Sequence, residues 1–452
     1  MDRTGANMKT KTRINVLEGN IKSLMIRLAL PSMGGMFAII VFNLTDTFFV
    51  SRLGTDTLAA MGFTFPVVMI IGAFSGGISL GAGSVLARAM GSGDEHKMHR
   101  IATDGILLSV LFVIMISGVG LLTMQSLFVL MGAKGISLDL VTDYMTIWYA
   151  GAFVVVIPPV SDSSMRAMGD MVRPLFVMVL CAVTNFILDP ILIFGMFGMP
   201  VMGIKGAALA TVISRFIGMI LTLSFVHFHY GLLDFKYKSP RELVESWGLI
   251  LKIGIPNVVV RLLPQLLRAV MTKLAASVAG VVAVAAIAAG QRIESFATIV
   301  SMAVGVAIVP IIGQNYGAKK YDRVLEARHL MIRFSIVYGI VLLILVIPFG
   351  PMLSKIFSED TEVIKLTTTY LRIILVGSIG LNQYNWLSES FNAVGKPSFS
   401  LLINGVGTVV ILIPAIYIGV NIGGFMGMIA LLAIGQLLVG GFAIILSRKY
   451  LL

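Results

Sequence analysis

Twelve continuous apolar stretches, each long enough to cross a bilayer as a helix, run through the 452-residue sequence. A transmembrane helix needs about 20 apolar residues. Strands of a membrane barrel would instead alternate apolar and polar residues over about ten positions. The pattern therefore predicts an all-α polytopic membrane protein. The stretches are residues 24–50, 57–87, 102–131, 140–161, 171–195, 203–226, 249–278, 281–312, 331–353, 363–387, 398–420 and 424–446.

The composition excludes a soluble or disordered chain. Charged residues make up only 12% of the sequence and hydrophobic residues 57%, whereas soluble domains carry roughly 25% charged residues. The formal net charge of +12 would suggest nucleic acid in a soluble protein. In a membrane protein it reflects the Lys and Arg residues of cytoplasmic loops, so we expect the lipid bilayer, and no nucleic acid, as partner. The single cysteine, Cys181, excludes disulfides within the chain.

Basic residues gather in every second loop, which predicts the topology. Because Lys and Arg are enriched on the cytoplasmic side, we expect both termini in the cytoplasm of a cell that carries the chain in its inner or plasma membrane. The loops near residues 197 and 421 lack charge, and residues 358–360 are acidic. The basic segments are residues 3–22, 88–100, 166–173, 236–241, 319–323 and 448–449.

The second half of the chain repeats the first at an offset of 225 or 226 residues. The segment Leu28–Pro31 recurs as Ile253–Pro256, and Tyr144 recurs as Tyr370. Since each half holds six helices, an even number, both halves enter the membrane from the same side. We therefore expect two six-helix bundles related by pseudo-two-fold symmetry along the membrane normal, with the substrate path between them. Two further matches pair Met90–Ser92 with Tyr316–Ala318 and Ser164–Gly169 with Ser390–Gly395.

Four segments follow from this pattern. Residues 1–22 form a cytoplasmic tail, 23–229 an N-lobe with helices one to six, 230–248 a linker, and 249–452 a C-lobe with helices seven to twelve. In the linker, Ser239, Pro240 and Glu242 fit the capping pattern of a helix N-terminus. We expect a short interfacial helix there, on the cytoplasmic face.

Two carboxylates stand out within the apolar stretches, Asp46 and Asp189. Each costs roughly 2.5 to 3.5 kcal/mol at membrane depth, so they need partners, protons or cations. Asn185 lies one helical turn before Asp189, and Pro190 frees the backbone carbonyl of Phe186. Such hard oxygen ligands suit a small cation. In the alternative interpretation, each Asp lies close to the headgroups and ends a bent helix.

No motif in the sequence indicates ATP hydrolysis or another enzymatic reaction. The G-x-x-x-x-G-K-[ST] loop that holds nucleotide phosphates is absent, and no nucleophile and base converge. We therefore expect a transporter without an organic cofactor.

The sequence resembles the multidrug and toxic compound extrusion (MATE) transporters over nearly its whole length. The resemblance rests on the two similar halves, on Leu28–Pro31 followed by Asp46, and on the segment Asn185–Gly195 followed by Gly206–Thr211. It implies a monomeric antiporter that exchanges Na⁺ or H⁺ for small lipophilic or cationic drugs. The resemblance implies that the coupling ion binds at Asp46, Asn185, Asp189 and Thr211, with Tyr144 nearby. If sodium is that ion, the implied Na⁺ ligands are Asp46, Asn185 and Asp189. Pro31 is the implied site of a bend that lets the first helix move.

The C-terminal half departs from the NorM-like branch of that family. Instead of carboxylates in helix seven it offers Arg261, Gln265, Arg268 and Lys273, so the chain is more similar to the archaeal and DinF-like branches. Arg261, Gln265 and Glu294 could form a polar cluster, in which Glu294 is either a second cation site or a structural partner of Arg261. Alternative functions are a flippase for lipid-linked saccharides or lipids of the same superfamily, a channel, or a membrane-embedded enzyme.

Overall fold

The computed structural model describes residues 15–235 and 239–452, and within these ranges it contains helices and no strand. Arg3, Lys9, Lys11 and Arg13 of the expected tail, and Lys236 and Lys238 of the linker, lie outside the described residues. The helices are α1 Ile21–Ser51, α2 Thr55–Ser92, α3 Glu95–Leu130, α4 Ile136–Ala150, α5 Phe153–Val156, α6 Pro158–Ala167, α7 Val172–Phe194, η1 Met196–Gly198, α8 Ile204–Ser224, η2 Phe225–His229, α9 Pro240–Gly317, α10 Tyr321–Lys355, α11 Thr361–Ala393, α12 Pro397–Gly405, η3 Val406–Leu412 and α13 Ile413–Tyr450.

Two helical segments are too long to be single spans. The 78 residues of α9 would extend roughly 117 Å, several times the ~30 Å bilayer core. The chain breaks α9 at Ala279 and Gly280, and α13 at Gly423 and Gly424; Gly280 and Gly424 adopt left-handed φ values of 61° and 56°, which glycine accepts without strain.

These breaks fix the number of spans. Within the described residues, nine helices are long and apolar enough to cross a membrane, and α4 forms a tenth span with α5–α6 across a 64° bend. The two breaks divide two of these helices, which gives twelve spans. The predicted twelve-helix membrane fold is confirmed.

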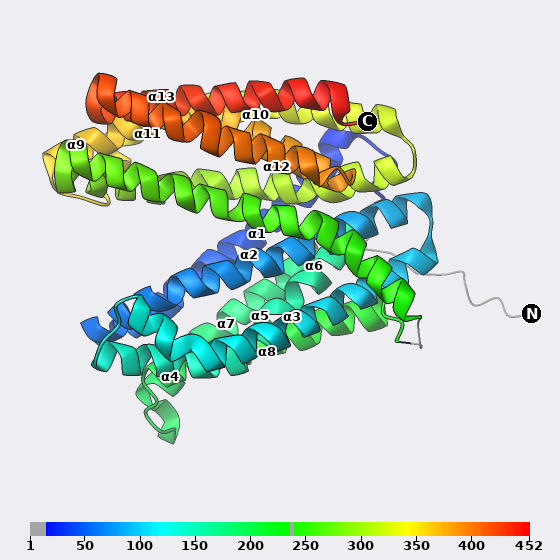
Figure 1. The fold of residues 1–452 in the computed structure, drawn as a ribbon, viewed down its shortest axis with the longest axis horizontal. Coiled ribbons are helices and arrows are strands. Elements are labelled where there is room, and N and C mark those ends of the chain that lie inside the picture. The colour runs from blue at the N-terminus through cyan, green and yellow to red at the C-terminus, as the bar shows by residue number, and fades with distance from the viewer. Residues whose placement is uncertain (1–14, 236–238) are drawn as a thin grey trace, which may run out of the picture. The chain divides into compact units, whose positions relative to one another are not determined.

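The described residues group into two compact units. The first contains Leu30–Gly254, and the second contains Leu17–Ala29 together with Ile255–Leu452. Within each unit the long helices run alongside one another as a bundle (Figure 1). The chain passes between units next to Pro31 and Pro256, the two prolines that the repeat relates. Because proline removes a backbone hydrogen bond, α1 and α9 are weakened where they change unit.

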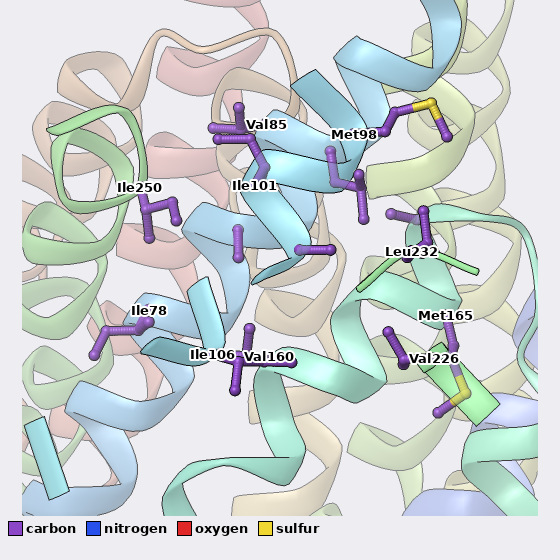
Figure 2. Packing of buried hydrophobic residues seen from close by; sticks show 14 of the residues in the cluster. Ile78, Val85, Met98, Ile101, Ile106, Val160, Met165, Val226, Leu232 and Ile250 are labelled. Atoms are coloured by element: carbon purple, nitrogen blue, oxygen red, sulfur yellow. The ribbon is translucent and has the colours of Figure 1, made fainter. Parts of the chain in front are cut away.

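A buried apolar core holds the first unit together, and it includes the start of α9. Ile78 of α2, Ile106 of α3, Val160 of α6, Val226 of η2 and Ile250 of α9 all belong to it. Figure 2 shows these side chains converging from their different helices. Buried aliphatic side chains of this kind each stabilise a fold by about 1.5 to 3 kcal/mol.

The expected short helix in the linker is not a separate element. α9 does begin at Pro240, as the capping pattern predicts, but it continues without a break beyond Gly248 into the next span. Its first turns are fixed to α3: Arg100 donates to the Glu242 carbonyl oxygen, at 2.5 Å, and Trp247 Nε1 donates to the Asp104 carbonyl oxygen, at 2.9 Å. Helical continuity and these bonds make residues 240–254 part of the first bundle.

Glycines let α2 and α9 approach at backbone distance. A Cβ atom on Gly81 would lie 2.3 Å from the Ile250 carbonyl oxygen, a distance that no real contact allows. Small residues permit such close packing between membrane helices.

We predict that Gly81→Ala destabilises the protein by about 1 to 3 kcal/mol, the usual cost of overpacking. Thermal unfolding of the purified protein in detergent measures the effect. Gly72→Ala is the matched control in the same helix, because a Cβ atom there meets nothing within 4 Å. Equal unfolding temperatures for the two variants would contradict the proposed packing.

Candidate functional site

The expected coupling residues come from four helices of the first unit and meet inside it. Asp46 lies on α1, Tyr144 on α4, Asn185 and Asp189 on α7, and Thr211 on α8. All five are at most 9% exposed. Asp46 interacts electrostatically with Asp189, Tyr144 interacts with both carboxylates, and the Thr211 hydroxyl faces Asp46. Residues far apart in the sequence thus form one polar cluster.

Asp189 is an interior residue of its helix. Asn185 Nδ2 donates a hydrogen bond to Asp189 Oδ1 at 3.1 Å across one turn. α7 continues past Pro190 to Phe194, and Asp189 is fully buried. Asp189 therefore lies inside α7, somewhat more than one turn before its last residue.

Four oxygen atoms of the cluster have no hydrogen-bond partner among the described residues. They are Asp46 Oδ1, Asn185 Oδ1, Asp189 Oδ2 and Thr211 Oγ1. Buried polar atoms in folded proteins are nearly always paired, and two carboxylates, an amide oxygen and a hydroxyl are hard oxygen donors. Protons on the carboxylates, or a small cation such as Na⁺, fit this donor set. Within the described residues, no three His, Cys, Asp or Glu side chains gather into a metal-binding group.

Close contact between α7 and α8 positions the Thr211 side chain. A Cβ atom on Gly206 would lie 2.5 Å from the Leu192 carbonyl oxygen, and one on Gly218 would lie 2.4 Å from Cys181 Sγ. Both glycines are therefore required for α8 to approach α7 this closely. Thr211 lies between them in the sequence, and its hydroxyl faces Asp46 of α1.

Two further charged residues of this region were missed by the sequence analysis. Arg215 lies one turn after Thr211 on α8, and its Cζ atom lies 4.8 Å from the centre of the Phe42 ring. Asp162 on α6 is 5% exposed and pairs with Arg166 at 4.0 Å. The sequence does contain a signal for both residues, namely a charge inside or at the edge of an apolar stretch. Arg215 lies inside the stretch 203–226, and Asp162 directly follows the stretch 140–161.

A pocket opens beside the cluster, within the first unit. It is lined by side chains of α1, α5, α6, α7 and α8. Phe42, Asp162, Cys181 and Arg215 are among them. Arg215 is therefore shared between the pocket and the carboxylate cluster, since it also acts electrostatically on Asp46.

The second unit contains a polar cluster that differs from the expected one. Tyr370 Oη donates to Glu294 Oε2 at 3.0 Å, and the basic residue that acts on Glu294 is Arg268. Arg261, the partner of Glu294 in one of the two alternatives considered, instead acts on Glu389. Gln265 lies one turn after Arg261 on α9. The helical spacing of Arg261 and Gln265 could not reveal that α11 supplies both Tyr370 and the second carboxylate, Glu389.

Comparison with known proteins places this architecture in a family. Residues 31–191 and 256–418 each match the MatE family. The chain belongs to the MatE family. The two matches start 225 residues apart, the offset of the sequence repeat. MatE proteins are transporters and not enzymes, so the chain is a multi-pass membrane transporter of small molecules.

Individual MatE relatives resemble the chain over nearly its full length. An FAD transporter of Shewanella oneidensis is 33% identical over 95% of both chains. A probable multidrug resistance protein NorM of Thermotoga maritima is 24% identical over 91% of this chain and 89% of its own. A solved structure, the outward-facing conformation of a multidrug resistance MATE family transporter of the MOP superfamily, is 27% identical, covers 98% of both chains and gives a TM-score of 0.89.

We predict that Tyr370→Phe lowers the free energy of unfolding by about 1 to 3 kcal/mol, because the Glu294 carboxyl loses a hydrogen-bond donor in a buried setting. Denaturation in detergent measures the loss. Tyr417→Phe serves as control, since that side chain is 47% exposed. A loss no larger than that of the control would show that the Tyr370 bond contributes nothing to stability.

Proposed function

We propose that the chain is a secondary active exporter that exchanges Na⁺ or H⁺ for small amphipathic molecules by alternating access. The observation that carries the proposal is the set of four oxygens, on Asp46, Asn185, Asp189 and Thr211, for which the described part of the chain offers no hydrogen-bond partner. Paired carboxylates in an apolar environment are costly when both are ionised. A proton or Na⁺ bound there removes that cost, and its release restores it.

Competition between the cation and the substrate for this site would couple cation entry to substrate export. Cation entry from outside neutralises Asp46 and Asp189 and favours one orientation of the helices, while substrate entering from inside favours the other. A ligand shifts such an equilibrium only by its differential affinity for the two states. The prolines at 31 and 256, beside the points where the chain changes unit, are the proposed flexible points.

The proposed topology and membrane follow from the loop charges. With basic residues in every second loop, both termini lie in the cytoplasm and the chain resides in the inner or plasma membrane. We further propose that it acts as a monomer. We assign it to the archaeal and DinF-like side of the family, because Asn185, Asp189 and Pro190 are present and the NorM-type acids of helix seven are replaced by basic residues.

Cationic or lipophilic drugs are the first proposed substrates, in line with the multidrug names of relatives. The Shewanella relative supports a second candidate, export of a flavin nucleotide, because it is 33% identical over 95% of the chain. A lipid-saccharide flippase stays an alternative, for which Arg261, Arg268 and Lys273 supply the cationic side chains.

We predict that Asp189→Asn reduces ion-driven efflux at least about tenfold, within the 5- to 150-fold range expected when a coupling of 1 to 3 kcal/mol is lost. Efflux from cells with matched expression is the measurement. Asp56→Asn is the control, since Asp56 is exposed in the first turn of α2. Wild-type ion-driven efflux by Asp189→Asn would overturn the proposed role.

We also predict that purified protein in liposomes moves a fluorescent cation only when a Na⁺ gradient or a pH gradient is imposed, because one of the two ions neutralises the carboxylates. Each gradient is applied alone and then both are dissipated with ionophores. Transport that depends on neither gradient would reject coupled exchange. Conductance without counter-ion movement would indicate a channel.

A further inference from the structure

Arg215 is a cationic side chain in the middle of a membrane helix. It lies on α8, inside the candidate span Ile204–His229. Charged residues at such positions are expensive and mark functional sites. Among the described residues, no carboxylate oxygen lies within 4.0 Å of its guanidinium, and no hydrogen bond to it is formed.

Helices α1, α4 and α7 each contribute a neighbour of Arg215. Phe42 of α1 packs on the guanidinium, and Asp46, one turn later on the same helix, attracts it. Tyr144 of α4 and Cys181 of α7 are the other groups in electrostatic range. A guanidinium that packs on an aromatic ring keeps the N–H groups along its edge available. None of the described residues uses the hydrogen-bonding capacity of these N–H groups.

The pocket beside Arg215 is otherwise apolar, apart from one acid. Its walls include Ile39, Val154 and Met178. The acid is Asp162, which has a cation of its own in Arg166, at 4.0 Å. Arg215 is thus the charged group of the pocket for which no described residue places an oppositely charged atom within 4.0 Å.

We propose that Arg215 makes this pocket select substrates with an acidic group, a phosphate or a carboxylate, attached to a flat aromatic ring. The acidic group binds the edge of the guanidinium in a bidentate manner, and the ring packs against Phe42 and Met178. This inference rests on the proposed export function and specifies its substrate class. This class is distinct from the cationic drugs that the family resemblance implies, because here the guanidinium itself binds the acidic group of the substrate.

A pair of flavins with one ring system tests the proposal. Riboflavin is neutral and flavin mononucleotide carries a phosphate, so the ratio of their affinities isolates the acidic group. Equilibrium binding to the full-length protein in nanodiscs is followed by flavin fluorescence, without any ion gradient. We expect the wild type to bind flavin mononucleotide about ten- to hundredfold more tightly than riboflavin, the range for a charged hydrogen-bonded contact.

Variants then assign the preference to one side chain. Arg215→Met should bring the affinity for flavin mononucleotide down to that for riboflavin without changing the latter, and Arg215→Lys should keep part of the preference. Arg52→Met is the matched control, because Arg52 also packs on a phenylalanine, Phe48, at 5.1 Å, but is exposed. It should behave as wild type.

Three results would overturn the proposal: equal wild-type affinities, no binding of either flavin, or an equal loss of both affinities in Arg215→Met. The last would indicate that Arg215 serves only as an internal counter-ion of Asp46. The ratio of the two wild-type affinities tests the preference for an acidic group even if a variant fails to fold. Binding is measured without an ion gradient, so a missing preference for flavin mononucleotide would not contradict ion-coupled export. Conversely, if ion-coupled export is disproved, the ratio of the two flavin affinities can still be interpreted.

Discussion

The cost of placing charge inside apolar helices is the constraint on which this protein depends. In the first unit, Asp46 and Asp189 are buried with one oxygen each unpaired among the described residues, and the Arg215 guanidinium packs on the ring of Phe42. Within the ranges that the structure describes, no direct ion pair joins these charges, so none satisfies them permanently. Their compensation is thereby left to molecules that come and go, and this is what an exchanger requires.

The fold supports this arrangement through close backbone contacts. Gly206 and Gly218 bring α8 against α7, so that Thr211 and Arg215 face the carboxylates from one helix face. Gly81 does the same for α2 and the start of α9. At the same time the chain changes unit beside Pro31 and Pro256, where a helix lacks a backbone hydrogen bond. Rigid packing within the first unit thus coexists with weakened helices at its borders.

Much of this could be predicted from the sequence, because hydrophobic length and buried acids leave strong signals. The predicted gap at residues 279–280 coincides with the break in α9. Helical spacing placed Asn185 and Asp189 on one face, whereas the resemblance to a known family supplied the expectation that Asp46 joins them. Arg215 and Asp162 were overlooked, since single charges inside or beside an apolar stretch change its hydropathy little. The partner of Glu294 could not be predicted, because it depends on which residues of α11 face α9 in space.

The central claim is that the buried carboxylate pair itself changes its protonation or cation binding during exchange. Infrared difference spectroscopy of the protein in lipid, with Na⁺ added at constant pH or with pH raised without Na⁺, observes carboxyl groups directly. The account predicts a carboxyl band that responds to one of these changes and disappears in both Asp46→Asn and Asp189→Asn. A responding band that persists unchanged when both residues are replaced would contradict it.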